Sequence, residues 1–127
     1  TFVMSAGGND ALSHVGEILH LGLADFHAIK EAFRIRYVKT INAILSYDQP
    51  LIVCTIYNPK YPEPEMQILA EAGLSFFNDV ITEEALRLNL PIIDLREVCA
   101  SAEAFANPIE PSEIGGDLIT NTIISHL

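Results

Sequence analysis

The chain has 127 residues, 50% of them hydrophobic and 19% charged, which excludes intrinsic disorder and fits one globular domain over residues 1–127. Its 17 acidic and 7 basic side chains give a formal net charge of −10, so nucleic acid and anionic membrane surfaces would be repelled. No apolar run reaches the roughly 18 residues that a membrane span needs.

The first part of the chain predicts a strand, a glycine-rich turn and a long helix. Phe2 to Ala6 has the composition of a short strand and leads into Gly7 to Asp10. Residues 11–24 are mixed, with one or two helical turns and then a loop. A helix begins at Asp25, the predicted N-cap, and ends before Pro50. Its apolar positions recur at helical spacing: Phe26, Ile29, Phe33, Tyr37, Ile41 and Ile44.

The second part predicts a strand, a helix and another strand. Leu51 to Ile56 is apolar on both faces, which is typical of the middle of a covered parallel sheet. A helix is expected from about Glu65 to Leu88, with a break near Gly73. Pro91 to Leu95 is the third expected strand.

The last part predicts a long loop and a final helix. After a loop of about 15 residues, Ser112 is expected to cap a helix that runs through His126. Gly115 and Gly116 in its first turn would let it pack closely against a neighbour.

Strands that alternate with helices predict an α/β fold with a parallel sheet between helical layers. The carboxyl ends of its strands would share one edge, where such folds bind ligands. Gly7 to Asp10, Tyr57 to Pro59 and residues 94–112 should meet there. Three strands make a narrow sheet, so we expect either self-association or an upstream segment to complete it.

The turn from Gly7 to Asp10 is the segment with the clearest chemistry. Glycines after a strand let the backbone approach a ligand, and the Asn9 amide could donate to a developing oxyanion. Asp10 could hold the turn by accepting backbone N–H groups. The alternative is an ordinary turn in which Asn9 or Asp10 only caps a helix.

The sequence resembles the SGNH hydrolases, also called GDSL-type esterases and lipases, at two segments. These are Gly7 to Asp10, and Asn107 to Ser112 with the glycines that follow. In that family a Gly-x-Asn-Asp block follows the third strand, and its Asn serves the oxyanion hole. The last block is an Asp-x-x-His loop, often followed by Pro-Ser and a glycine-bearing helix. Tyr57-Asn58-Pro59 and Asp94-Leu95 are also similar. The resemblance implies a flavodoxin-like three-layer α/β/α sandwich, here lacking its first strands, and ester hydrolysis by an upstream serine.

Several family features are missing from the sequence. The Gly-Asp-Ser nucleophile block and the second block are absent, Asn107 stands at the usual Asp position, and Glu110 stands at the usual His position. Only Asn9 matches a catalytic-type residue of the family. A carboxylate is a weaker base than imidazole, with a pKa near 4.3 against about 6.5. His14, just after the turn, is the alternative as a displaced histidine.

The other candidates carry weaker signals. Asp94 could touch a ligand at a strand end or cap the loop that follows. Lys30 to Lys39 supply four of the seven bases and form a solvated helix face. No histidine pair has metal-ligand spacing, and Cys54 and Cys99 form no disulfide framework or zinc pattern, so we expect no cofactor. The small number of cysteines favours a cytoplasmic location, while the sequence does not decide whether a signal peptide lies upstream of Thr1.

Three functions follow from these residues. The first is an esterase or acylhydrolase that acts on a small ester or acylated substrate. The second is a catalytically impaired module that binds a small polar or carbohydrate-type ligand. The third, from fold class alone, is a flavodoxin-like nucleotide-binding or regulatory domain. It would need acidic contacts at the tip of the first strand, where only Asp10 offers a carboxylate.

Overall fold

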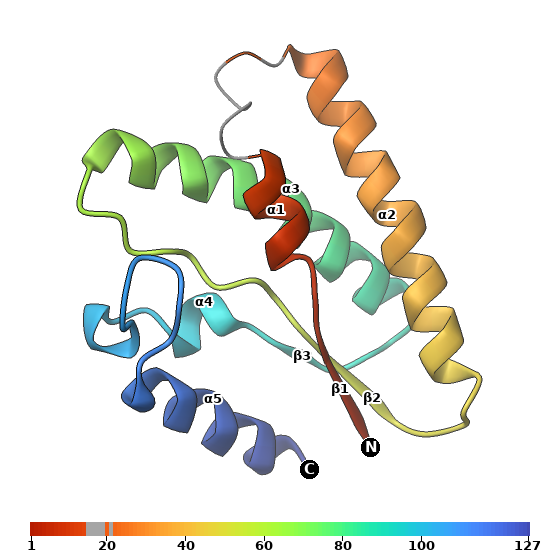
Figure 1. The fold of residues 1–127 in the computed structure, drawn as a ribbon. Helices are drawn as coiled ribbons and strands as arrows, with labels where there is room; N and C mark the ends of the chain where they lie inside the picture. The colour runs from red at the N-terminus through yellow and green to blue at the C-terminus, as the bar shows by residue number, and fades with distance from the viewer. Residues whose placement is uncertain (15–19, 21) are drawn as a thin grey trace.

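The computed structural model describes residues 1–14, 20 and 22–127, and it has the predicted α/β architecture. Each strand is followed by at least one helix along the chain, with short helical turns before the last helix (Figure 1). The elements are β1 (Phe2–Ser5), α1 (Gly8–His14), α2 (Leu23–Leu45), β2 (Leu51–Cys54), α3 (Pro64–Arg87), β3 (Ile92–Ile93), α4 (Leu95–Val98), the 3₁₀ helix η2 (Ala102–Ala104) and α5 (Glu113–His126).

The three strands form a parallel sheet in the order β1-β2-β3. Phe2 to Ser5 pair in register with Leu51 to Cys54, and Cys54 pairs on its other side with Ile93. All four residues of β2 are buried, as expected for a strand covered on both faces. Phe2 and Val3 on β1 are exposed.

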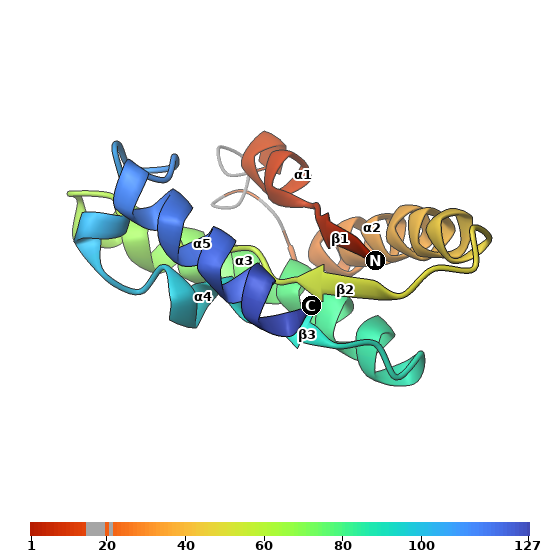
Figure 2. The same cartoon turned by 90° about the horizontal axis from the view of Figure 1, so that it is seen from below.

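Helices cover both faces of the sheet, which gives a three-layer α/β sandwich (Figure 2). On one face, Leu51 and Val53 pack with buried apolar residues of α2 and α3, including Phe33 and Ile81. On the other face, Ile52 and Cys54 pack with Ile93 and Leu95, and Ile119 of α5 lies against them. The apolar spacing read from the sequence therefore identified the face of α2 that packs into the core.

Several predicted boundaries were wrong, and local hydrogen bonds explain why. The N-cap of α2 is Gly22, not Asp25, which lies inside the helix and accepts a hydrogen bond from the Gly22 N–H at 3.1 Å. The expected break at Gly73 is absent, because this buried glycine lies within a continuous α3 whose packing outweighs a propensity cost of about 1 kcal/mol. Part of the predicted loop, at 15–19 and 21, lies outside the described residues.

The second and third strands are shorter than predicted, and the long loop is partly helical. β2 ends at Cys54 instead of Ile56, and β3 is reduced to Ile92 and Ile93. Pro91 has no N–H to donate, while Asp94 already caps α4. In contrast, the predicted cap of α5 is confirmed, since the Ser112 hydroxyl oxygen accepts from the Gly115 N–H at 3.2 Å.

Glu84 joins α3 to α2 through a nearly buried carboxylate. Arg34 donates to it at 2.9 Å and Arg87 at 2.8 Å. Burial opposes ionisation of this carboxyl, but the hydrogen bonds from Arg87 and Arg34 outweigh it, so its pKa lies below its ordinary value of 4.5. The ion pairs therefore stabilise the packing of the two long helices.

Replacing Glu84 with glutamine is expected to lower the free energy of unfolding by about 1–2 kcal/mol at pH 7. A carboxyl whose pKa is lowered by folding stabilises the protein above its unfolded pKa, and this contribution is lost as pH falls. The gap between wild type and E84Q should therefore be full at pH 7 and shrink below the ordinary value of 4.5. Urea unfolding of both proteins at pH 7 and at pH 3 measures this difference in the free energy of unfolding.

The neighbouring Glu83 provides the matched control. Its side chain is 54% exposed and also accepts from Arg34. E83Q should cost less than about 0.5 kcal/mol at either pH, because exposed ion pairs contribute little. An E84Q gap that stays the same at pH 3 would contradict the assignment of the stabilising charge to Glu84.

No helix among the described residues is both long enough and apolar enough to cross a bilayer.

Candidate functional site

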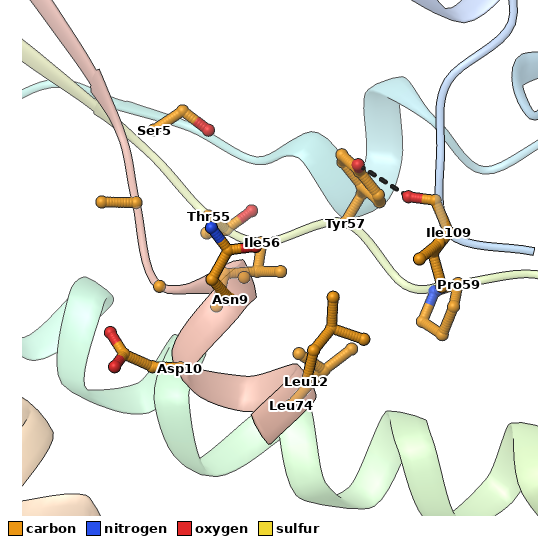
Figure 3. A pocket seen from close by; sticks show the side chains of 13 residues that line it. Ser5, Asn9, Asp10, Leu12, Thr55, Ile56, Tyr57, Pro59, Leu74 and Ile109 are labelled. Atoms are coloured by element: carbon orange, nitrogen blue, oxygen red, sulfur yellow. Dashed lines mark hydrogen bonds between the residues drawn. The ribbon is translucent and has the colours of Figure 1, made fainter. Parts of the chain in front are cut away.

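A pocket of about 480 Å³ lies at the carboxyl ends of β1 and β2, the edge where the sequence predicted a site (Figure 3). Its volume is in the range of small-molecule sites. The turn after β1, the end of β2, one side of α3 and a loop before α5 contribute to it. The lining residues are Ser5 to Asp10, Leu12, Thr55 to Tyr57, Pro59, Leu74 and Ile109.

The turn between β1 and α1 requires glycine at position 7. Gly7 has a φ of +110°, and a Cβ there would lie 3.0 Å from the Phe33 ring and 3.1 Å from Ile56 Cδ1. Gly8 begins α1, and its nearest neighbour to an added Cβ would be Ile56 Cγ2 at 4.0 Å. Of the two glycines, only Gly7 is required by the backbone conformation and by the close approach of neighbouring side chains. The turn packs directly against Ile56.

Asn9 lies in the first turn of α1 and lines the pocket with an exposed side chain. In Figure 3 its amide extends from the helix toward the end of β2, near the Thr55 label. Its amide makes no hydrogen bond within the part of the chain that the structure describes. The amide N–H groups are thus available to an acceptor in the pocket.

Asp10 lies in the same turn, but its carboxylate is directed away from the pocket in Figure 3. Arg36 Nη2 of α2 donates to Asp10 Oδ1 at 3.3 Å across an exposed surface. Asp10 therefore binds α2 through Arg36, in place of the backbone N–H groups that the sequence suggested.

Tyr57 connects the pocket to the loop before α5. Its hydroxyl donates to the Ile109 carbonyl oxygen at 2.9 Å, and its ring packs edge-on against Phe105. Burial raises the pKa of the Tyr57 hydroxyl, with smaller contributions from Cys99 and Glu110, so it stays protonated as a donor. Asn58 is half-buried and is not among the pocket-lining residues, whereas Pro59 is.

Asn107 and Glu110 lie in that loop and bind each other. Asn107 Nδ2 donates to Glu110 Oε2 at 2.7 Å, while Asn107 Oδ1 accepts from the backbone N–H of Ile109 at 3.0 Å and of Glu110 at 2.9 Å. Both side chains are exposed and neither lines the pocket, which only Ile109 of this loop reaches. Asn107 and Glu110, the two positions that the resemblance had aligned with an Asp and a His, thus form a self-contained turn.

Asp94 has the capping role that the sequence left open. It accepts from the Arg96 backbone N–H at 3.1 Å and from the Thr55 hydroxyl at 2.8 Å. The side-chain hydrogen bonds from Arg96 hold the pKa of Asp94 below its usual value. It does not line the pocket, but it fixes Thr55, which does.

His14 lies apart from the pocket in the structure. It lines a separate small hollow with Phe26, Lys30 and Phe77, at the far end of α1 from the Gly7 turn. The sequence had placed it near Asn9 because only a few residues separate them, but the helical rise of α1 carries the two side chains to different hollows.

The pocket is polar on one side and apolar on the other. Ser5, Asn9 and Thr55 lie toward the strands, while Leu12, Leu74, Pro59 and Ile109 lie opposite (Figure 3). No Lys, Arg or His lines it, and no group of three metal-binding side chains occurs among the described residues. The arrangement suits a neutral ligand that has a hydrogen-bond acceptor at one end and an apolar group at the other.

Comparisons with known proteins assign no family to this chain. A scan against protein-family models gave no match, and a search of the curated proteins gave no significant match.

Sequence reasoning missed two polar residues that shape this pocket. Thr55 is buried at the end of β2, donates to Asp94 and accepts from the Leu95 N–H at 2.9 Å. Asn78 is buried in α3 and binds the backbone of Ile56 on both sides. Polar residues within apolar segments were the available signal, since a buried polar group needs partners.

Proposed function

We propose that this chain is the C-terminal part of an SGNH-type ester hydrolase that acts on small neutral esters. The observation that carries the proposal is the place of Asn9, whose unoccupied amide lines a concave site at the strand ends. The parallel order β1-β2-β3 with helices on both faces supports a flavodoxin-like sandwich. Further strands would then pair with the edge of β1 that lies opposite β2.

In this proposal a serine outside these residues attacks the ester carbonyl carbon. The carbonyl π electrons move to oxygen, and Asn9 Nδ2 donates a hydrogen bond to the resulting oxyanion. The acyl group would lie against Leu12, Leu74 and Ile109, and the absence of a lining cation disfavours anionic substrates. Neither Glu110 nor His14 lines the pocket, so the base that takes the serine proton would also lie outside these residues.

A binding module without turnover is the second candidate. The hydrogen bond between Asn107 and Glu110 favours it, because it engages both residues at the positions of the family's acid and base. The same pocket would then hold a neutral carbonyl or sugar group without cleaving it.

A fluorophosphonate separates the two candidates, because it modifies only an activated serine. The native protein is treated with this reagent and its intact mass is measured. One adduct on a protein heavier than 14.0 kDa is the result expected for the hydrolase. A protein without adduct that still binds hexanamide, an uncharged carbonyl compound, would support the binding module. Absence of both would overturn both candidates.

A further inference from the structure

Asn78 replaces a neighbouring strand at the point where β2 leaves the sheet. The last hydrogen bond of the ladder between β2 and β3 comes from Thr55, the residue that follows β2. Its N–H donates to the Ile93 carbonyl oxygen at 3.0 Å. At the next residue Asn78 Oδ1 accepts from the Ile56 N–H at 2.8 Å, and Asn78 Nδ2 donates to the Ile56 carbonyl at 3.0 Å. One amide side chain thus satisfies both backbone groups of Ile56, as a paired strand would.

The side chain of Ile56, whose backbone Asn78 holds, packs against the Gly7-Gly8 turn that precedes Asn9. Its Cδ1 atom lies 3.1 Å from the position of a Cβ on Gly7, and its Cγ2 atom lies 4.0 Å from that on Gly8. Ile56 and both glycines line the pocket. A displacement of the Ile56 backbone would therefore move the surface against which the start of α1 packs.

We infer that Asn78 is a positioning residue for the Asn9 site, acting through Ile56 on the Gly7-Gly8 turn. Asn78 is 1% exposed, lies on α3 and does not itself line the pocket. Its two hydrogen bonds fix Ile56, which packs against the turn together with Phe33, and the turn sets where the Asn9 backbone stands at the edge of the pocket. This inference rests on the proposed function, since it concerns the same carbonyl-binding site.

The test uses N78A in the full protein with hexanamide as the probe. Exchange of the Ile56 amide hydrogen should accelerate about tenfold relative to that of Val53. The NMR signals of the Asn9 side-chain amide should shift, and the Kd for hexanamide should rise about tenfold. In a double-mutant cycle, N9A should weaken binding little further in the N78A background. A control cycle of N78A with N121A, on the exposed face of α5, should be additive.

A merely structural role for Asn78 predicts a different result. N78A would then lower the unfolding midpoint, while the folded protein kept wild-type Asn9 signals and wild-type affinity for hexanamide. That outcome overturns the inference. If N78A does not fold, I56V replaces it, because it keeps both backbone hydrogen bonds and removes the Cδ1 methyl that faces Gly7. I56V should then shift the Asn9 signals, and unchanged signals would overturn the inference.

Failure of the proposed function would look different from failure of this inference. If wild-type protein does not bind hexanamide, the carbonyl-binding function fails. The Asn9 amide signals in N78A and I56V still decide whether Asn78 positions that side chain.

Discussion

Replacing Gly115 with alanine is expected to lower the free energy of unfolding by about 3 kcal/mol, roughly 10 °C in Tm. A Cβ at this position would overlap the Ala104 carbonyl oxygen and lie 2.9 Å from the Ala104 carbonyl carbon. That oxygen already accepts from the Ser112 N–H at 2.8 Å, so it cannot move without disturbing the cap of α5. Thermal unfolding followed by circular dichroism measures the loss.

Gly116 is the control in the adjacent position. A Cβ there would meet no atom within 4 Å, so G116A should be neutral or raise the free energy of unfolding by up to about 1 kcal/mol through helix propensity. The free energies of unfolding of the two variants are thus expected to differ by about 3 kcal/mol or more. Equal stability of G115A and G116A would contradict the close packing of α5 on η2.

Under the proposed hydrolase function, replacing Asn9 with alanine should lower kcat by about 10²- to 10³-fold, with little change in KM. The expected loss falls on kcat because the amide donates to an oxyanion that exists only in the transition state and intermediate. Asn9 is exposed and packs little, so the unfolding midpoint should change by less than about 2 °C. Steady-state hydrolysis of a neutral p-nitrophenyl ester provides the kinetic constants.

The control for Asn9 is another exposed asparagine. N121A removes the same amide from an exposed position of α5 that does not line the pocket, and it should leave kcat and KM unchanged. A fall in kcat of less than threefold for N9A would remove Asn9 from the oxyanion hole. A rise in KM with constant kcat would instead assign it to ground-state binding.

The sequence was most informative where a single pattern determines a single element. The apolar spacing from Phe26 to Ile44 identified the buried face of α2, and the run from Leu51 predicted the central strand. Gly7, a glycine directly after a strand, predicted the sharp turn that its φ of +110° confirms, and Ser112 predicted the start of α5. Each of these signals is local, so the neighbouring residues suffice to read it.

The parts that could not be read depend on contacts between distant segments. Nothing near Ile56 in the sequence indicates that Asn78 will take both of its backbone hydrogen bonds and end β2 early. The direction of Asp10 depends on Arg36 in another helix. The bond between Asn107 and Glu110 is local, but their place outside the pocket depends on how Tyr57 holds the Ile109 carbonyl.

The parallel pairing of the strands also determines the order in which the chain can fold. Phe2 pairs with Leu51, and Val53 pairs with Ile92, so each pairing must close a loop that contains a whole long helix. Helices α2 and α3 can form from contacts near in sequence, whereas the ladder on either side of Leu51–Cys54 forms only after both loops have closed. During synthesis the central strand β2 therefore leaves the ribosome well before its second partner, β3, and α3 has to shield it in that interval.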